Sequence, residues 1–284
     1  MQKYVVLEKA VGETPLSCAE RWRAAEPALV GVPLSYAGRL DPMASGKLLV
    51  LIGEECKKQS AYHNLDKEYE FSVLFGISSD TQDVLGLLST ASLVGTPFAE
   101  GGIGVVGEAS SVPTRLGFEY IADSLIGPLT FSYPLFSAKT VEGKPLHMWT
   151  LEGRLDEIEI PTRTSIIYEL ELTELRTVPR QEVAATALQK INSFPEVTDP
   201  KKALGADFRR KDVRADWQDV ATDFSLPSEY TIAAFRCIAS SGAYMRTLAT
   251  LIAEKCDTTG LAFSIHRTKI GHYNKEKQDW EQLL

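Results

Sequence analysis

Residues 37–46 read Ala-Gly-Arg-Leu-Asp-Pro-Met-Ala-Ser-Gly, and an apolar run, Leu48 to Ile52, follows almost directly. The stretch places a single acid, Asp41, between two glycines and beside a proline. Glycine lets the backbone approach a ligand closely, and proline fixes the turn. Taken alone, the pattern is better explained by an aspartate that caps its own turn. The rest of the chain is needed to decide between a ligand-binding loop and a structural turn.

A phosphate-binding loop is the first alternative, because Gly46-Lys47 resembles the end of such a motif. The pattern G-x-x-x-x-G-K-[ST] requires glycine at position 41 and serine or threonine at position 48. This chain has Asp41 and Leu48 there, so the phosphate-loop interpretation fails at two positions.

Residues 38–46 resemble the G-x-L-D-P-x-A-[ST]-G motif of TruB-type pseudouridine synthases. Further stretches follow in the order of that family across most of the chain. They are residues 9–14 (K-P-x-G-x-T, with Ala10 at the proline), 67–69 (K-x-Y), 76–86 (T-D-T-x-D-x-x-G), 137–146 (S-A-x-K-x-x-G-K-x-L, one residue shorter), 240–249 (S-S-G-x-Y-I-R-[ST]-L-A) and 267–271 (R-T-R-I-G). One such match could arise by chance, but a series in order could not.

The resemblance implies a pseudouridine synthase fold, which is an α+β fold with a mixed, mostly antiparallel sheet flanked by helices. The residue pattern agrees, because strands and helices alternate without a βαβ rhythm. We expect a single catalytic domain over residues 1–284, without the C-terminal RNA-binding domain that many members append. An insertion that closes over RNA is expected at approximately 133–163. An extra segment at approximately 193–228 has no functional explanation in the sequence.

Local patterns predict most of the elements. Thr14-Pro15 is typical of a helix start, and residues 67–75 alternate as in a half-buried strand. The other predicted strands are 4–8, 165–175, 231–239 and a short one at 269–273. The other predicted helices are 54–64, 118–126, 180–192 and 243–255. Loops are predicted at 30–45 and within 92–117.

Three residues match catalytic positions of the family. The resemblance implies that Asp41 is the catalytic carboxylate, that Arg246 pairs with it, and that Tyr69 stacks on the target base. The simpler explanations are a surface arginine on a helix for Arg246 and a core aromatic on a strand for Tyr69. Sequence leaves open whether Asp41 attacks ribose directly or assists elimination.

Substrate contacts are expected from two groups of residues. Near the catalytic aspartate and in the same pocket they are Tyr36, Gly38, Arg39, Leu40 and Tyr244. Cations expected to meet RNA phosphates are Lys67, Lys139, Lys144, Arg267 and Lys269, although a solvated surface charge is the commoner case for any one of them. Tyr36 occupies the position of a family histidine that helps hold the flipped-out loop. Tyrosine can stack on a base in that place, but it carries no charge near neutral pH.

Composition limits the function without deciding it. The chain has 284 residues and a formal net charge of −8, which argues against nonspecific coating of nucleic acid. A local basic surface can still bind phosphate on an acidic protein. We therefore expect positive charge to be confined to one face near Asp41.

Other features point to a cytoplasmic enzyme without a metal or cofactor. Four cysteines and four histidines are scattered, so no zinc site is expected and buried thiols are the simpler explanation. No secretory or membrane-spanning stretch is recognisable. The expected partner is the T-arm stem-loop of tRNA, bound by a monomer that needs no obligatory protein partner and no membrane.

The leading hypothesis is isomerisation of uridine 55 in the T-loop of tRNA. A tRNA-folding chaperone with little catalysis is the alternative from another class. Hydrolysis or elimination at a glycosidic bond is a third hypothesis. A conventional glycosidase needs two facing carboxylates, and Asp80 and Asp83 fit a structural loop better. A guide-RNA-dependent relative is less favoured, because no additional RNA-binding domain is recognisable.

Overall fold

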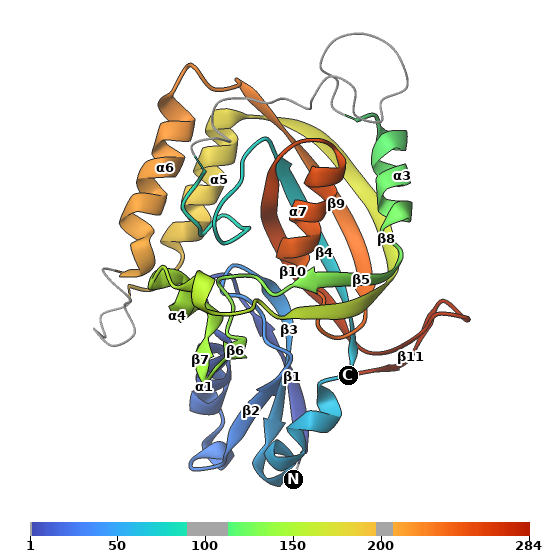
Figure 1. The fold of residues 1–284 in the computed structure, drawn as a ribbon. Helices are drawn as coiled ribbons and strands as arrows, with labels where there is room; N and C mark the ends of the chain where they lie inside the picture. The colour runs from blue at the N-terminus through green and yellow to red at the C-terminus, as the bar shows by residue number, and fades with distance from the viewer. Residues whose placement is uncertain (1, 90–112, 197–206) are drawn as a thin grey trace.

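The computed structural model describes residues 2–89, 113–196 and 207–284 (Figure 1). Its helices are α1 (Pro15–Ala25), α3 (Arg115–Ser124), α4 (Leu146–Leu151), α5 (Arg180–Asn192), α6 (Arg210–Thr222) and α7 (Met245–Lys255), with 3-10 turns η1 (Pro27–Leu29), η2 (Gly53–Tyr62), η3 (Leu155–Glu157) and η4 (Asp207–Arg209). Its strands are β1 (Tyr4–Lys9), β2 (Leu34–Ala37), β3 (Ser45–Ile52), β4 (Asp66–Phe75), β5 (Gly127–Ser132), β6 (Thr140–Val141), β7 (Lys144–Pro145), β8 (Thr162–Pro179), β9 (Glu229–Ala239), β10 (Gly260–Asn274) and β11 (Asp279–Leu283).

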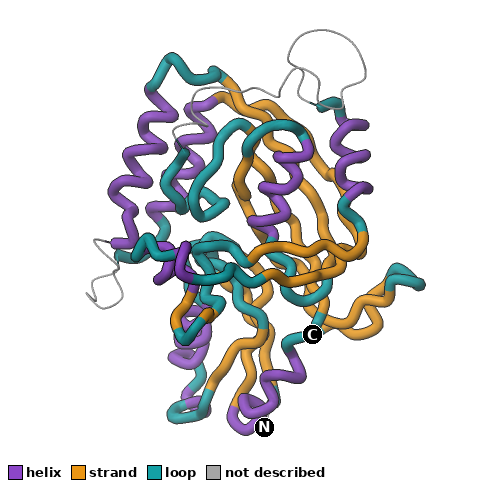
Figure 2. The backbone as a smooth tube through the Cα atoms, viewed as in Figure 1, coloured by secondary structure: helices purple, strands orange, loops and turns teal. Residues whose placement is uncertain are grey.

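One sheet organises the described part of the chain. Nine strands join it in the order β1-β3-β10-β4-β9-β8-β5, with β2 beside β3 and β11 beside β10. Its pairs are antiparallel except for β3 with β10, which run parallel at two residue pairs, His266↔Ser45 and Arg267↔Gly46. Figure 2 shows the long strands running through the molecule, with α5 and α6 on one side of its upper part and α3 on the other. The predicted α+β class with a mostly antiparallel sheet is confirmed.

The largest apolar core lies between the sheet and helices α3, α5, α6 and α7. On β4, the side chains of Phe71, Val73 and Phe75 belong to this core, and Phe75 packs against Phe118 of α3 with ring centroids 5.2 Å apart. Full burial of one such side chain contributes about 1.5–3 kcal/mol. Packing of this kind fixes β4, and with it the residues at the start of β4 that line the functional site.

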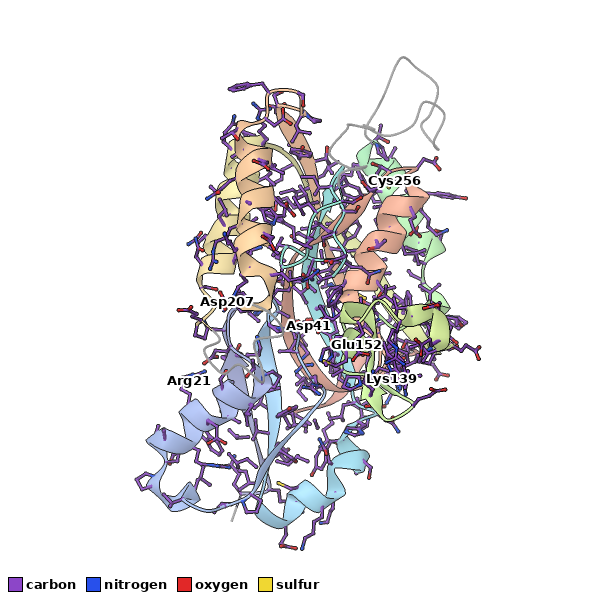
Figure 3. All side chains as sticks on the ribbon, turned by 60° about the vertical axis from the view of Figure 1, so that its left-hand side comes forward. Arg21, Asp41, Lys139, Glu152, Asp207 and Cys256 are labelled. Carbon is purple, nitrogen blue, oxygen red and sulfur yellow. The ribbon has the colours of Figure 1, made fainter. Side chains whose placement is uncertain are left out.

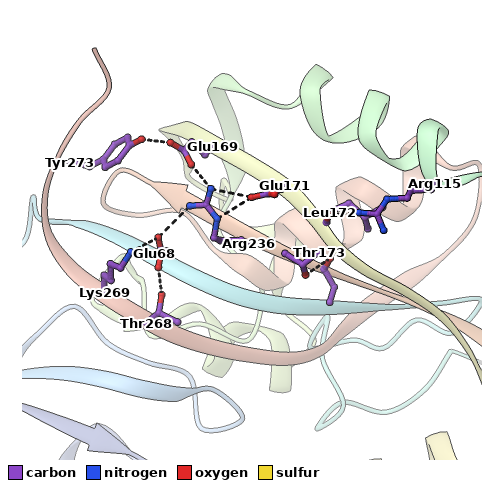
Figure 4. Close-up of polar contacts among 11 residues, drawn as sticks. Glu68, Arg115, Glu169, Glu171, Leu172, Thr173, Arg236, Thr268, Lys269 and Tyr273 are labelled. Atoms are coloured by element: carbon purple, nitrogen blue, oxygen red, sulfur yellow. Dashed lines mark hydrogen bonds and ion pairs between the residues drawn. The ribbon is translucent and has the colours of Figure 1, made fainter. Parts of the chain in front are cut away.

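On the opposite face of β4, a charged network covers Glu68 (Figure 4). Arg236 of β9 donates to Glu169 at 2.6 Å and to Glu68 at 3.4 Å. Lys269 of β10 donates to the same Glu68 at 3.0 Å. Glu68 is consequently 5% exposed. The strand is thus more deeply buried than its alternating pattern predicts, because neighbouring strands supply the counter-charges.

The first helix begins where the sequence predicts it. Thr14 Oγ1 accepts a hydrogen bond from the backbone N–H of Ser17 at 3.0 Å, and Pro15 occupies the first turn of α1. A cap of this kind is typically worth about 1 kcal/mol. Helix α5 also has the predicted bounds, Arg180–Asn192.

Three predictions about elements were wrong. The expected loop at 30–45 contains β2, which pairs with the buried β3 despite its small and polar residues. The expected helix at 54–64 is the 3-10 segment η2, broken by a non-helical backbone at Lys58. The expected short strand at 269–273 is the end of the long β10, because this strand pairs along its length with β4. Most of the loop predicted within 92–117 lies outside the described residues.

Two further expectations concern thiols and membranes. Cys18, Cys237 and Cys256 are buried and Cys56 is half-buried, and all four thiols are free. The prediction of buried thiols is confirmed for three of them. Within the described residues, no helix is both long enough and apolar enough to cross a membrane.

Candidate active site

The loop that carries Asp41 connects β2 to β3. The neighbouring side chains of Leu40 and Met43 are 4% and 1% exposed and pack into the main core. The backbone N–H of Ala44 donates to the carbonyl of Asp41 at 3.0 Å, which closes a turn. The side chain of Asp41 remains 31% exposed. The buried neighbours thus anchor the loop while the carboxylate stays accessible, and Figure 3 places it where the N-terminal strands meet the rest of the fold.

Arg267 ties both ends of this loop to β10. Its side chain is 1% exposed, and it donates from Nε to the carbonyl of Lys47 at 2.6 Å and from a terminal nitrogen to the carbonyl of Gly38 at 3.1 Å. The two strands approach so closely that a Cβ on Gly46 would lie 2.3 Å from the Arg267 carbonyl oxygen. Gly46 also has a φ of +102°, which favours glycine. Arg267 therefore holds the loop in place through backbone contacts.

Lys9 supports the same loop from β1. It is 1% exposed and donates to the carbonyls of Ala10 at 3.0 Å and Pro42 at 3.3 Å, and also to the carbonyl of Ala44. Burial lowers the pKa of Lys9 to about 8. The lysine of the N-terminal motif thus holds the backbone on either side of Met43.

Arg246 lies in the first turn of α7 and reaches Asp41 from the far end of the chain. Its Nε donates to Asp41 Oδ2 at 2.7 Å, and its terminal nitrogens donate to the carbonyls of Thr81 at 2.7 Å and Phe136 at 3.4 Å. The side chain is 3% exposed. A guanidinium held at three points is a rigid partner, and it fixes the orientation of the carboxylate.

Asp83 is a second acid beside this arginine. Its Oδ2 lies 3.7 Å from Arg246 Nε, and its Oδ1 accepts from the Thr81 hydroxyl at 2.7 Å and the Leu85 N–H at 2.9 Å. Burial raises the pKa of Asp83, while Arg246 and these two donors oppose the rise. The sequence suggested only a structural loop for this motif. The spacing of Asp80 and Asp83 was the available signal, but it did not reveal the contact with Arg246.

Two tyrosines line the same site. Tyr69 of β4 is 8% exposed, and burial raises its pKa while the guanidinium of Arg267 opposes the rise. Tyr244 packs edge-on against Tyr133 with ring centroids 5.8 Å apart, and burial raises its pKa to about 12. Both phenols are therefore neutral near pH 7 and present apolar ring surface. Tyr69 thus belongs to the main core and also lines the cavity described below.

A cavity of about 1270 Å³ connects these residues. It brings together most of the residues that the sequence singled out: Asp41, Tyr69, Arg246, Tyr36, Gly38, Arg39, Leu40, Tyr244, Lys67, Lys139 and Arg267. Among the described residues that line it, eight are arginine or lysine, and two, Asp41 and Asp83, are acidic. Positive charge thus gathers around Asp41 in a chain of net charge −8.

Five of these cations have no acidic partner in the part of the chain that the structure describes. Within the described residues, no ion pair joins a carboxylate to Arg39, Lys67, Lys139, Arg163 or Arg267. The Arg39 guanidinium lies 5.7 Å from the centre of the Tyr36 ring, and Lys139 Nζ lies 5.1 Å from the centre of the Tyr133 ring. Cations stacked on aromatic rings in a cavity form a suitable surface for a nucleotide, which has both phosphate and ring faces.

Lys67 is a special case among the cations. It is 5% exposed and donates to the carbonyl of Leu65. Burial, with a smaller contribution from Arg267, lowers its pKa to about 7. Near neutral pH this amine is therefore only partly charged in the protein without RNA.

Lys144 and Lys269 do not line the cavity. Lys144 Nζ lies 2.6 Å from Glu152 and 4.0 Å from the centre of the Trp149 ring. Its charge is therefore paired with a carboxylate of the same segment. Lys269 belongs to the network on the other face of the sheet, with Glu68 (Figure 4). Both lysines were predicted from motif positions, which do not reveal a nearby glutamate.

Arg163 lines the cavity and was missed in the sequence. It extends from the start of β8 and donates to the carbonyl of Ser241 at 3.0 Å, while its Nε is buried without a hydrogen-bond partner among the described residues. A Cβ on Gly242 would lie 1.8 Å from that Nε. The glycine of the Ser-Ser-Gly turn thus leaves the space through which Arg163 passes. Its sequence context, at the end of the insertion expected at 133–163, carried no motif.

The N-terminal part of the chain, residues 32–189, matches the model of the TruB family pseudouridylate synthase (N terminal domain). This match covers more than half of the chain. The chain belongs to the TruB family. The matched residues include Asp41, Tyr69 and the insertion. Arg246 lies beyond the match, and it is the fold that brings it to Asp41 in this TruB-family chain.

Similar proteins carry related names. The tRNA pseudouridine synthase B of Caldicellulosiruptor saccharolyticus is 32% identical over 61% of this chain and 52% of its own length. That of Geobacillus kaustophilus is 32% identical over 62% of this chain and 55% of its own length. The tRNA pseudouridine synthase 4 of Saccharomyces cerevisiae is 31% identical over 50% of this chain and 31% of its own length. The chain thus spans about half of the length of the bacterial relatives that it matches.

Proposed function

We propose that this chain converts uridine to pseudouridine in tRNA, at position 55 of the T-arm loop. The observation that carries the proposal is the Asp41 carboxylate, held at 2.7 Å by the buried Arg246 inside a cavity with a cationic lining. The relatives that are named as tRNA pseudouridine synthases support the reaction and the RNA class. The position within tRNA rests on the motif resemblance.

The reaction requires no external reagent. The bond between N1 of uracil and C1′ of ribose breaks, the base rotates, and a bond from C5 to C1′ forms. C5 loses its proton and N1 gains one, so atoms and electrons balance. We assign to Asp41 the negative charge that acts at C1′, and to Arg246 the positioning of that carboxylate. In the described part of the chain, the other oxygen of Asp41, Oδ1, has no hydrogen-bond donor, which leaves it available to the ribose.

The cavity walls suit a nucleotide that has left its stack. A target base inside a folded loop must be flipped out, and RNA enzymes commonly stack such bases on aromatic rings. Tyr69 and Tyr244 supply neutral rings beside Asp41. We assign base stacking to Tyr69 and the pocket wall to Tyr244. Tyr36, with Arg39 beside its ring, would contact the neighbouring nucleotides.

The test is pseudouridine formation in an unmodified T-arm stem-loop, mapped with carbodiimide. Wild type, Asp41→Asn and the control Glu70→Gln are compared, because Glu70 is an exposed acid on the other face of β4. Product from wild type and Glu70→Gln but not from Asp41→Asn supports the proposal. A second stem-loop, with cytidine in place of the T-loop uridine, should give no product. Product at another uridine in it would contradict the assignment to position 55.

Two other outcomes would favour the alternatives. RNA that is bound and refolded by both wild type and Asp41→Asn without product favours a tRNA-folding chaperone. Release of free uracil favours hydrolysis of the glycosidic bond. Either result would remove the isomerase assignment.

A further inference from the structure

Two segments hold the inner arginine from the side opposite Asp41. Arg246 donates to the carbonyl of Thr81, in the turn that follows β4, and to the carbonyl of Phe136, at the start of the insertion. The hydrogen bond to the Phe136 carbonyl is 3.4 Å long, which is close to the limit for such a bond. Arg246 therefore keeps both contacts only while the two segments stay close together. Whatever holds the two segments together also fixes the position of Arg246.

Arg209, which also lines the cavity, bridges the same two segments. One terminal nitrogen lies 2.5 Å from Asp80 Oδ2 and the other lies 3.4 Å from Asp80 Oδ1. Its guanidinium carbon lies 4.6 Å from the centre of the Phe136 ring. Asp80 is adjacent to Thr81, and Phe136 is the residue whose carbonyl Arg246 uses. Arg209 thus contacts the residue next to one acceptor of Arg246, Thr81, and the ring of the other acceptor, Phe136.

Helix α6, which follows Arg209, is itself fixed to the segment that follows β4. Helix α6 begins at the next residue, and its Asp216 accepts from the backbone N–H of Leu88 at 2.9 Å. Its Trp217 is fully buried and donates from Nε1 to the carbonyl of Val84 at 3.0 Å. Helix α6 is therefore docked against the segment that contains Asp80 and Asp83.

Arg210 supplies a second anchor for the start of the helix. Its side chain is 6% exposed and donates to the carbonyls of Phe194 at 2.9 Å and Pro195 at 2.8 Å. The end of α5 and the start of α6 are joined in this way. Arg209 consequently acts from a rigid support rather than from a free loop.

We propose that Arg209 is a positioning residue for the reaction, which gives Arg209 and the helix α6 that follows it a function as a brace of the active site. The inference rests on the proposed isomerase function. Arg209 holds the turn at Asp80 close to Phe136. This keeps the carbonyls of Thr81 and Phe136 at the spacing at which Arg246 donates from its Nε to Asp41. Arg209 itself makes no contact with Asp41 among those that the structure gives.

The experiment compares Arg209→Ala, Arg209→Lys and Arg214→Ala in steady-state kinetics on the T-arm stem-loop. Arg214 is the matched control, because it lies on the same helix and donates to Asn192 instead of the active site. Displacement of a catalytic group by a fraction of an ångström to 1 Å lowers rates by about tenfold to a hundredfold. We expect a fall in kcat of that size for Arg209→Ala, with KM within about twofold of wild type, because substrate contacts remain.

The lysine variant separates positioning from folding. Lysine keeps a positive charge for Asp80 but loses the planar fork and the stacking of the guanidinium on the Phe136 ring. Arg209→Lys should therefore recover part of the kcat that Arg209→Ala loses. Melting temperatures are measured for all variants, and a double-mutant cycle with Asp80→Ala should give a strongly non-additive kcat.

Three results would overturn the proposal while wild type remains active. One is equal kcat for Arg209→Ala and Arg214→Ala. Another is a defect confined to KM with a changed salt dependence, which would make Arg209 an RNA phosphate ligand instead. The third is additivity of Arg209→Ala and Asp80→Ala. An inactive wild type would instead refute the proposed function itself, so the two failures are distinguishable.

Discussion

Arg246 and Asp41 lie 205 positions apart in the sequence, and Nε of the arginine donates to Oδ2 of the aspartate at 2.7 Å. The arginine is 3% exposed and the aspartate 31% exposed, so a buried cation holds an accessible anion. Such an asymmetry favours reactivity at the carboxylate, because the rigid partner stays out of the solvent. The same arginine also faces the buried Asp83 at 3.7 Å.

Replacement of the buried arginine should separate catalysis from binding. Lysine provides one ammonium for a site where a planar guanidinium meets Asp41 and the carbonyls of Thr81 and Phe136. We expect Arg246→Lys to lower kcat for the stem-loop by about a hundredfold or more, as for loss of one preorganised charge contact. Arg236→Lys, in the network on the other sheet face, is the control and should keep near wild-type kcat. Equal losses in both variants would contradict this role.

Gly46, where β3 pairs with β10, should be essential for stability. In Gly46→Ala the new Cβ would meet the Arg267 backbone at 2.3 Å at a φ of +102°, so we expect a loss of about 3 kcal/mol or more in the free energy of unfolding. Gly31→Ala is the matched control: φ is +74° and no atom lies within 4 Å of its Cβ. That variant should lose only about 1 kcal/mol. Urea unfolding measures the loss of stability in each variant. Similar losses would show that the backbone of Arg267 moves to accommodate the new Cβ.

Lys67 should make the free energy of unfolding depend on pH. Burial lowers its pKa from an ordinary 10.5 to about 7. Between these values the unfolded chain binds a proton that the folded chain does not bind, so stability rises with pH across this range. In Lys67→Met this contribution disappears, and the rise between pH 7.5 and 9.5 should become shallower by up to about 1.4 kcal/mol per pH unit.

The measurement for Lys67 is urea unfolding at several pH values, with Lys275→Met as the exposed control. Lys9 and Lys190, whose pKa values burial lowers to about 8, remain in every variant and contribute equally to each slope. Identical slopes for Lys67→Met and wild type would mean that Lys67 is charged in the folded protein.

Arg163 should contribute to RNA affinity. It lines the cavity without a carboxylate partner among the described residues, so a phosphate is a suitable counter-charge. We expect Arg163→Ala to weaken binding of the stem-loop and to reduce the salt slope of the affinity by about one. Arg176→Ala is the control, because this arginine lies on the same strand, is 46% exposed and faces Glu174 at 3.9 Å. An unchanged salt slope for Arg163→Ala would exclude a phosphate contact.

Local sequence was enough to predict several elements. Helix α5 has the bounds that its composition indicates, and α1 starts at the Thr14-Pro15 cap, because caps and side-chain periodicity act between residues a few positions apart. The same holds for the motif around Asp41, whose glycines and proline shape the loop directly. Its catalytic role stays a prediction until Asp41→Asn is measured.

The sequence by itself therefore determined the family, the sheet-rich α+β class and the segment that presents Asp41. Only the tertiary structure decided which cations share a cavity with it. Lys144 and Lys269 pair with Glu152 and Glu68 away from the cavity, whereas Arg163 and Arg209 line it from segments that carried no motif. The physical reason is that burial and the choice of an ion-pair partner depend on residues far away in the chain. Neither property is encoded in local spacing, and both are set when the strands and helices pack.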